Sequence, residues 1–465
     1  MPRRLAGRAR RAYGSFPGQF WLVFAATFFY LGSSAIVFPF FGIYMTERLG
    51  ISRTLAGVVL GASSLAGLPM LLFGGAWADR RGRRGVMLFS LVASALVSFG
   101  LAAVTTIWQA VLLVLLNGAF GWPLFLTASN AMVADLVDQD RTAEAYGIVR
   151  VAVNAGVVVG PAVAGFALAA GVSFAWLFGV AGLGCAALFV VLLVRLAETR
   201  PEPAAVLTSA GPLDAAEAIA AAAERLVPPV VEEARAAAPA DAPVAAAPAR
   251  TRAAPAVGYA VILRDRTFLI FCLVSLLPLF CYGQIVSTFP VYLTQFLRLP
   301  LEQWGLLLSL NAVLVVVLQY PLVRRLRGRD DIRLLALASA LLAIGIGGAA
   351  LVYGLWQLWL LMIVFSIGEM LFVPLSTSLV SGMSTLEERG RYMGAWSLVW
   401  IGGQALSPLF AGWGMDALGG RAAFLVVLAA GLAGAALYPL LCRGVRERER
   451  RRRASPPAAS RASSP

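Results

Sequence analysis

The residue with the clearest potential for chemistry is Glu369, which lies in the apolar run FSIGEMLFVPL at residues 365–375. A charged side chain at the centre of a bilayer costs about 2.5–3.5 kcal/mol on insertion scales, so its retention there indicates a function. No arginine, lysine or histidine lies near Glu369 within this run. A carboxyl group removed from water without a cationic partner can hold a proton near neutral pH and release it when its surroundings change. Glu369 is therefore predicted to carry protons; the alternative is a protonated side chain that hydrogen-bonds a neighbouring helix.

The sequence contains no recognisable catalytic, nucleotide-binding or metal-binding motif. It contains no histidine, no nucleotide-binding loop and no Ser/His/Asp set. The four cysteines have no metal-ligand spacing. We therefore expect no metal site, no cofactor and no enzymatic activity, and a membrane-embedded enzyme or sensor is the alternative from a different class. The cysteines are Cys185, Cys272, Cys281 and Cys442.

The composition is typical of a membrane protein. The chain has 465 residues, of which 60% are hydrophobic and only 13% are charged, and its mean hydropathy is +0.80. A soluble protein of this length needs more charged residues to cover its surface. The net charge of +14 raises the possibility of nucleic-acid binding. However, the basic residues lie in short loops and tails between apolar runs, which favours membrane orientation and no nucleic-acid partner.

Twelve apolar segments are long enough to cross a bilayer as helices. The sequence therefore predicts an all-α integral membrane protein with twelve transmembrane helices. Six segments lie on each side of an Ala/Pro-rich stretch, which has too few large apolar residues to fold alone. In the first half they are 18–44, 54–78, 85–105, 108–136, 143–169 and 174–197. In the second half they are 266–294, 303–323, 333–353, 356–382, 391–415 and 421–442.

The loops differ in their arginine content. Twelve arginines fall in loops on one side of the predicted membrane and four in loops on the other. By the positive-inside rule, the richer side and both termini are cytoplasmic, in the plasma or inner membrane. The predicted organisation is a cytoplasmic tail (1–17), a six-helix bundle (18–198), a cytoplasmic linker (199–257), a second six-helix bundle (258–442) and an arginine-rich cytoplasmic tail (443–465).

The two halves repeat each other. Two parallel six-helix repeats are typical of transporters that bind substrate between the halves and move by rocking. We expect such a pseudo-symmetric protein to act as a monomer within the lipid bilayer. A shift of 248 residues aligns Tyr44, Thr46, Leu49 and Gly57 with Tyr292, Thr294, Leu297 and Gly305. A shift of 247 aligns Gly147, Gly156, Pro161, Ala164 and Gly165 with Gly394, Gly403, Pro408, Ala411 and Gly412.

The loop after the second segment carries the sequence GAWADRRGRR, residues 75–84. Its spacing resembles the loop 2–3 signature of the major facilitator superfamily. With an aspartate and an arginine further along the chain, it is interpreted as a conformational latch of ion pairs that join the halves on one side. Surface ion pairing or a simple orientation signal is the alternative. The residues are Gly75, Asp79, Arg80, Gly82, Arg83, Arg84, Asp135 and Arg141.

The fifth segment contains a regular series of small residues, which lets a second helix pack closely, and a Gly-Pro pair that bends it. The spacing resembles the antiporter motif of the drug:proton antiporter branch of the same superfamily, with Ala164 in place of the usual glycine. The eleventh segment repeats the series. The resemblance implies the major facilitator fold and a twelve-span multidrug exporter. The residues are Gly147, Gly156, Gly160, Pro161 and Gly165, then Gly394, Gly403, Pro408 and Gly412.

One departure from the family pattern concerns a buried arginine in the fourth segment. Here Asn117 occupies that position, so the resemblance does not carry the coupling mechanism with it. Arg150, in the fifth segment, is a candidate for the missing cation. The alternative is an interfacial arginine paired with Asp135. Both residues are therefore candidates for proton coupling beside Glu369.

Polar candidates for lining the substrate site are sparse, and aromatic residues are abundant. This composition suits amphipathic or cationic organic compounds better than sugars, which need many hydrogen-bonding groups. We predict proton-coupled efflux of such small molecules, with a metabolite or sugar transporter of the same fold as the alternative. The site candidates are Ser34, Asn117, Asn130, Asn154, Tyr282, Gln284, Asn311, Gln319, Trp396, Trp400 and Gln404.

Overall fold

A computed structural model describes residues 16–138, 141–199, 260–326, 329–384 and 388–441. The predicted linker except Thr199, residues 1–15 of the first predicted tail and the whole second predicted tail lie outside these residues. Every regular element among the described residues is a helix, which confirms the all-α prediction.

The first half consists of helices that mostly follow the predicted segments. Ser52 caps one of them by accepting a hydrogen bond from the Leu55 backbone N–H at 3.1 Å. The elements are α2 (Gly18–Ala35), η1 (Phe38–Phe40), α3 (Phe41–Ile43), η2 (Tyr44–Arg48), α4 (Arg53–Ala66), α5 (Leu68–Arg81), α6 (Arg83–Ala102), α7 (Ile107–Phe120), α8 (Trp122–Leu136), α9 (Thr142–Ala169) and α10 (Phe174–Arg195).

The second half has the same order of long helices. Asp265 and Asp330 cap two of them by accepting backbone N–H bonds, from Phe268 at 3.0 Å and from Ile332 at 3.2 Å. The elements are α13 (Ala260–Arg264), α14 (Arg266–Tyr282), α15 (Phe289–Gln295), α16 (Leu301–Leu326), α17 (Asp331–Gly347), η4 (Gly348–Leu351), α18 (Leu355–Met383), α19 (Arg389–Ala417), α20 (Gly420–Leu437) and η5 (Tyr438–Leu441).

The predicted count of twelve spans is confirmed in part. Among the described residues, ten helices are long and apolar enough to cross a membrane. The predicted span 266–294 is divided into the 17-residue α14 and the 7-residue α15. The predicted span 391–415 lies in α19, which has 29 residues but is not among the ten.

Two segments predicted as continuous are each made of two helices. The segment 54–78 is interrupted at Gly67, between α4 and α5, where the backbone stays helical (φ −72°, ψ −22°). The segment 108–136 is interrupted at Gly121, between α7 and α8, where the backbone is not helical (φ −82°, ψ −122°). In both cases proline is the second residue of the new helix, Pro69 or Pro123. Proline is tolerated in a first turn because the backbone N–H that it lacks has no partner there anyway.

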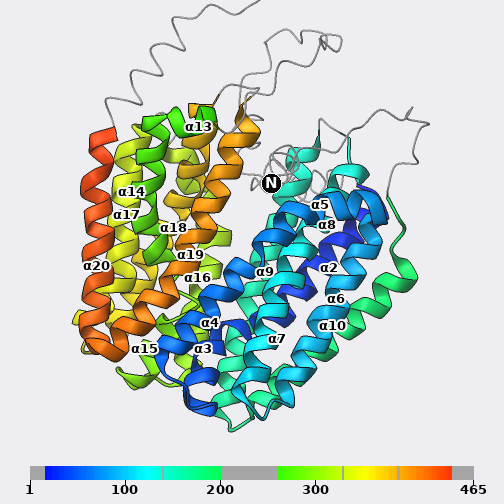
Figure 1. Cartoon of the computed structure of the whole chain (residues 1–465), viewed down its shortest axis with the longest axis horizontal. Helices are drawn as coiled ribbons and strands as arrows, with labels where there is room; N and C mark the ends of the chain where they lie inside the picture. Colours follow the sequence, from blue (N-terminus) through cyan, green and yellow to red (C-terminus); the bar gives the residue numbers. More distant parts are fainter. Residues whose placement is uncertain (1–15, 139–140, 200–259, 327–328, 385–387, 442–465) are drawn as a thin grey trace, which may run out of the picture.

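The helices form two groups that lie side by side (Figure 1), with α2–α10 in one and α13–α20 in the other. Each group has a buried core of its own, built around residues such as Phe20 and Phe125 in the first half, and Phe365 and Phe424 in the second. We call the end where α2 begins and α20 ends the terminal end, and the opposite end the far end. The ribbons converge at the far end and diverge toward the terminal end.

The halves touch where α4 packs along α19 and where α9 packs along α16. The Pro408 carbonyl oxygen lies against Gly57 and the Pro161 carbonyl oxygen lies against Gly305, each so close that an added Cβ atom would overlap it. These two contacts are equivalent under the sequence repeat, since Gly57 aligns with Gly305 and Pro161 with Pro408. The antiporter-like series thus supplies close backbone contacts between the halves.

Three other small residues of the series pack within their own half, whereas Gly165 and Gly412 lie against Leu301 and Arg53 of the opposite half. In α9, Gly156 lies against Phe28 and Gly160 against Ala35, both on α2. In α19, Gly403 lies against Leu279 of α14. One stripe of small residues therefore fixes each motif helix to its own bundle, and another lets it approach the opposite bundle.

We expect Gly57→Val to disfavour this conformation, because the new side chain would overlap the Pro408 backbone and overpacking costs about 1–3 kcal/mol. The matched control is Gly402→Val, since no atom lies within 4 Å of a Cβ atom added at Gly402. The distance between spin labels at Arg48 and Leu418, in a cysteine-free background, should lengthen in Gly57→Val and not in the control. Equal distances in both variants would contradict the prediction.

Candidate functional site

A polar group lies inside the second half around Glu369, at the middle of α18. Tyr282 of α14 donates a hydrogen bond to Glu369 Oε1 at 3.0 Å, and Asn311 of α16 donates to Oε2 at 2.7 Å. The Asn311 amide also donates to Ser366 Oγ at 3.0 Å. Two helices thus direct neutral hydrogen-bonding groups at one carboxyl group on a third helix. No ion pair joins Glu369 to an arginine among the described residues.

Aromatic rings surround the Tyr282 side of this group. The Tyr282 ring stacks with the Phe365 ring, with centroids 6.0 Å apart, and its centroid lies 5.4 Å from that of the Trp400 ring. Trp400 in turn lies 6.3 Å from Phe372 and 6.4 Å from Trp396. Ring faces of this kind attract organic cations and apolar bodies. The second half therefore combines one carboxyl group with an aromatic wall.

Arg150 of α9 brings a positive charge toward this group from the first half. Its charge acts on both the Glu369 carboxylate and the Tyr282 hydroxyl. The predicted alternative, a pair with Asp135, is not what the structure shows, since Asp135 Oδ2 lies 2.8 Å from Arg83 Nε. The Arg150 Nε atom is buried without a hydrogen-bond partner among the described residues.

The other predicted site residues are not joined to Glu369 by side-chain hydrogen bonds among the described residues. The Gln284 side chain links α14 to α19 by donating to the Ser407 carbonyl oxygen at 3.1 Å. Asn117 lies next to the helix break at Gly121, and the Asn130 backbone carbonyl accepts from Tyr146 at 3.0 Å. The remaining candidates occupy positions on α2, α9, α16 and α19, namely Ser34, Asn154, Gln319 and Gln404.

The predicted latch residues form a cluster at the terminal end. Arg83 bridges Asp79 at 3.0 Å and Asp135 at 2.8 Å. Arg141 pairs with Glu144 at 2.9 Å and lies over the Phe16 ring. These contacts lie within the first half in this conformation, so a latch that joins the halves stays a prediction. The other members lie at the same end of the bundle: Gly75 and Arg80 on α5, and Gly82 and Arg84 at the start of α6.

Glu198 is a member of this cluster that sequence reasoning missed, because it was placed at the edge of the linker. Its carboxylate accepts hydrogen bonds from the Arg83 and Arg84 backbone N–H groups, at 2.9 and 3.2 Å, and so caps α6. Gly82 has a φ of +92°, and a Cβ atom there would overlap a Glu198 oxygen. The glycine of the loop motif therefore makes room for this carboxylate.

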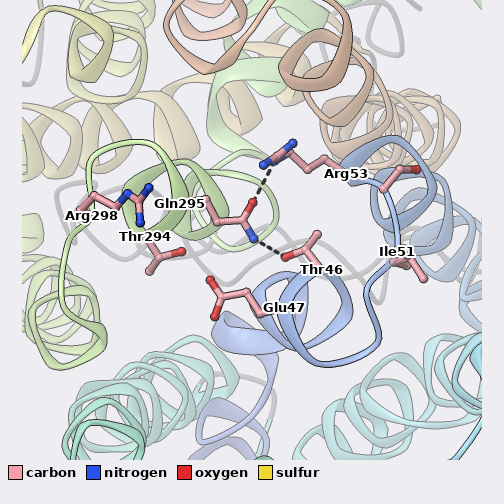
Figure 2. A pocket seen from close by; sticks show the side chains of 8 residues that line it. Thr46, Glu47, Ile51, Arg53, Thr294, Gln295 and Arg298 are labelled. Carbon is pink, nitrogen blue, oxygen red and sulfur yellow. Dashed lines mark hydrogen bonds between the residues drawn. The ribbon is translucent and has the colours of Figure 1, made fainter.

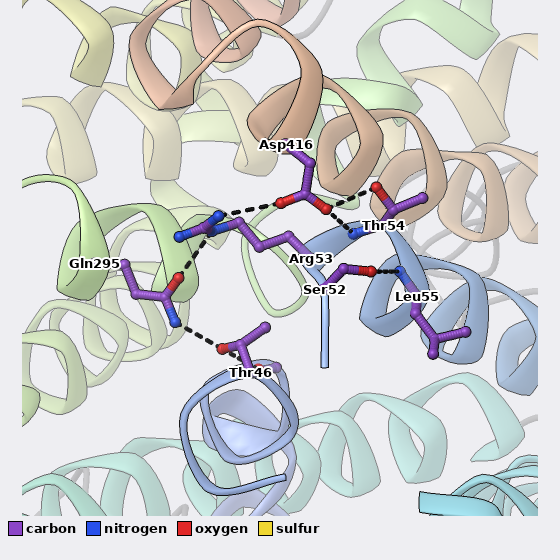
Figure 3. A network of polar contacts seen from close by, with 8 residues as sticks. Thr46, Ser52, Arg53, Thr54, Leu55, Gln295 and Asp416 are labelled. Atoms are coloured by element: carbon purple, nitrogen blue, oxygen red, sulfur yellow. Dashed lines mark hydrogen bonds and ion pairs between the residues drawn. The ribbon is translucent and has the colours of Figure 1, made fainter. Parts of the chain in front are cut away.

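A second missed group joins the two halves at the far end (Figure 3). The Arg53 guanidinium lies 3.1 Å from Asp416 Oδ1, and its Nε donates to Gln295 at 2.9 Å. Gln295 donates to Thr46 at 2.8 Å, while both the backbone N–H and the hydroxyl of Thr54 donate to Asp416 at 2.7 Å. We call these five residues the far-end network. Residues of α4 and η2 are thereby tied to residues of α15 and α19.

A pocket of about 340 Å³ opens beside the far-end network (Figure 2). It is lined by residues of both halves, including Glu47 and Arg53 from the first, and Thr294, Gln295 and Arg298 from the second. Arg298 has a φ of +57°, and Gly50, its counterpart under the 248-residue repeat, has a φ of +66°. The left-handed turn is thus repeated in both halves, although only one of them has glycine there.

The chain matches the family model described as Major Facilitator Superfamily at residues 23–347 and 305–464. It is 25% identical to the uncharacterized MFS-type transporter YqjV of Bacillus subtilis, over 89% of this chain and 90% of that protein. It is 26% identical to the multidrug resistance protein MdtH of Cronobacter sakazakii, over 83% of each chain.

A further relative is the Na(+), Li(+), K(+)/H(+) antiporter of Planococcus maritimus, which is 25% identical over 82% of this chain and 86% of that protein. Among solved structures, the nucleoside transporter NupG is similar in fold, with a TM-score of 0.69 and 14% identity, over 91% of this chain and all of that one.

We expect Asp416→Asn to weaken the far-end network. Burial tends to raise the pKa of Asp416, but hydrogen bonds from Thr54 and Arg53 outweigh it and hold that pKa below its ordinary value of 3.8. The carboxylate's contribution is therefore present at neutral pH and is lost as the pH falls through this lowered pKa. Partly exposed ion pairs contribute at most about 1 kcal/mol, which is roughly a fivefold change in population.

The distance between spin labels at Arg48 and Leu418 can be measured as a function of pH. In the unaltered protein this distance should lengthen only in strong acid. In Asp416→Asn it should already be longer in part of the molecules at neutral pH, and it should change less with acid. Ser52→Ala is the control, because Ser52 caps α4 and makes no bond to Asp416. An Asp416→Asn protein with the unaltered distance at every pH would contradict the assignment.

Proposed function

Because this chain belongs to the major facilitator superfamily, we propose that it exports small amphipathic or cationic organic compounds in exchange for protons. The observation that carries the proposal is the surroundings of Glu369. Its carboxyl group is partly buried in a membrane helix and is held by Tyr282 and Asn311 rather than by an ion pair. Ionisable residues in such positions usually mark ion or substrate pathways.

In this proposal Glu369 binds either a proton or the cationic part of a substrate. The neutral donors can adjust to either state, because a tyrosine hydroxyl both donates and accepts hydrogen bonds. The aromatic wall of Tyr282, Trp396 and Trp400 receives the apolar body of the substrate. Since proton and substrate compete for one carboxyl group, the inward movement of one drives the outward movement of the other.

In alternating access, the binding site opens first to one side of the membrane and then to the other. In the present conformation the halves are tied at the far end by Arg53, Gln295 and Asp416. By the excess of arginine in the loops of the terminal end, that end faces the cytoplasm. The predicted latch around Asp79, Arg83 and Asp135 is assigned to the opposite conformation, in which the terminal end is closed. The protein works as a monomer in the cell membrane, with both termini in the cytoplasm.

The relatives support transport but differ in cargo. MdtH is named for multidrug resistance and the Planococcus maritimus protein for cation/proton antiport, and both fit exchange with protons. A metabolite or sugar transporter of the same fold is the alternative. Sugar sites need many hydrogen-bonding side chains, and the group around Glu369 offers mainly aromatic surface.

We expect Glu369→Gln to impair proton-driven transport strongly, because glutamine cannot bind and release a proton. Its amide can still meet both partners, with the oxygen accepting from Asn311 and the NH2 group donating to the Tyr282 hydroxyl. Purified protein in liposomes with an imposed pH gradient should lose roughly tenfold or more of its proton-driven dye transport, the change that 1.4 kcal/mol produces. Glu47→Gln is the control, since Glu47 is an exposed residue at the far end. Unchanged coupling in Glu369→Gln would end the proton-carrier assignment.

A growth-inhibition panel tests the multidrug role. Cells that produce the protein should tolerate several chemically dissimilar amphipathic toxins at higher concentrations than cells without it, and the Glu369→Gln variant should give no protection. If the protein protects cells from none of the compounds in the panel, this result would contradict drug efflux and favour the metabolite alternative.

A further inference from the structure

The half-buried Arg150 guanidinium lacks a full set of hydrogen-bonding or ion-pairing partners. Its Nε atom is buried and makes no hydrogen bond, and no ion pair joins Arg150 to a carboxylate among the described residues. An uncompensated guanidinium in a membrane helix is costly, and such residues usually face a water-filled path or a substrate. A buried donor without a partner in a native structure needs an explanation.

The position of Arg150 follows from the contacts of α9 with α16. Along these antiparallel helices, Gly165 lies against Leu301, Pro161 against Gly305, and the Val158 carbonyl accepts from Ser309 at 2.5 Å. Arg150 lies eleven residues before Pro161. Eleven residues make about three turns of 3.6 residues, so Arg150 lies on the same face of α9, toward the second half.

The same contacts give the depth of Arg150 relative to Glu369. At 1.5 Å per residue, Arg150 is displaced by about 12 Å from Val158 toward the terminal end, and Asn311 by about 3 Å from Ser309. Arg150 therefore lies roughly 9 Å nearer to the terminal end than Asn311, which holds Glu369. The cation and the carboxyl group belong to opposite halves and differ in depth by less than the length of a small drug-like molecule.

Glu369 does not neutralise Arg150 through a direct bond. Both carboxylate oxygens accept hydrogen bonds from residues of the second half, Tyr282 on Oε1 and Asn311 on Oε2. These bonds hold the carboxylate against α14 and α16. Arg150 thus keeps donors available for a group that is not part of the protein.

We propose that Arg150 binds an acidic group of the substrate, so that the site is built for zwitterions. The amine of such a compound lies at Glu369 beside Trp400, and its carboxylate, sulfonate or phosphate lies at Arg150, nearer the terminal end. This assignment rests on the proposed function. It narrows the substrate class from amphipathic cations to compounds that carry both charges.

The two-point arrangement agrees with exchange against protons. The amine competes with the proton for Glu369, whereas the acidic group occupies Arg150 in either protonation state of Glu369. A purely cationic compound leaves Arg150 uncompensated and meets its repulsion. The acidic group therefore adds affinity without removing the competition on which exchange depends.

Rhodamine B and its methyl ester form a matched pair of probes, since both carry the aromatic cation and only the free acid carries a carboxylate. Binding to the full-length protein in lipid nanodiscs can be followed by fluorescence polarisation at neutral pH. A charge-assisted hydrogen bond contributes about 1.5–3 kcal/mol, so the free acid should bind roughly tenfold more tightly or better. Equal affinities for the acid and the ester would overturn the proposal.

Two substitutions complete the test. Arg150→Gln should weaken binding of rhodamine B about tenfold and leave the ester unchanged or bound more tightly, which also shows that the variant is folded. Arg150→Lys should retain part of the preference, because it keeps the charge but loses the planar fork. An equal loss for both dyes in folded Arg150→Gln would mean a structural role and overturn the proposal.

The test is separate from that of the proposed function. It measures equilibrium binding and needs no proton gradient. If Glu369→Gln retains proton coupling while the acid preference is present, the proton-carrier assignment fails and the Arg150 site stands. If coupling depends on Glu369 and the acid preference is absent, only the Arg150 site fails.

Discussion

The arrangement of the two halves depends on two backbone contacts in which a proline carbonyl lies against a glycine of the opposite bundle. Pro408 meets Gly57, and Pro161 meets Gly305, at distances that leave no room for a side chain. Because the two contacts are equivalent under the repeat, each half presents the same surface to the other. The proline-containing helices α9 and α19 therefore lie at the boundary between the halves.

A boundary made of small residues carries little energy that favours one conformation. Van der Waals contact between close backbones is lost gradually as helices separate, whereas a hydrogen-bonded ion pair is either made or broken. Such bonds occur at each end: the far-end network of Arg53, Gln295 and Asp416 ties the halves together, while Arg83 and Asp135 are paired within the first half. In this conformation the ion pair between the halves lies at the far end, while the glycine contacts leave the backbones of the two halves close together.

Much of the helical architecture could be predicted from the sequence, because apolar length and glycine spacing are local properties. The helix interruptions at Gly67 and Gly121 were missed, since proline in a first turn resembles proline inside a continuous span. Glu369 was found because its own run contains no partner, but Asn311 and Tyr282 come from helices distant in sequence. Asp416 and Glu198 lie at segment ends, where a carboxylate usually faces water, and no pattern in the sequence links them to Arg53 or Arg83.

The distribution of charge across the boundary bears on how a proton in one half can move both. Glu369 belongs to α18 and Arg150 to α9, and the charge of Arg150 acts on Glu369 across the contact between α9 and α16. In the proposed exchange, protonation of Glu369 removes the carboxylate charge that faces Arg150, and an amine bound at Glu369 replaces it with another set of contacts. A ligand can shift an equilibrium between conformations only by the difference in its interactions with them. In the proposed mechanism, a carboxyl group and a guanidinium on opposite halves provide that difference, because rocking of the halves would change their separation.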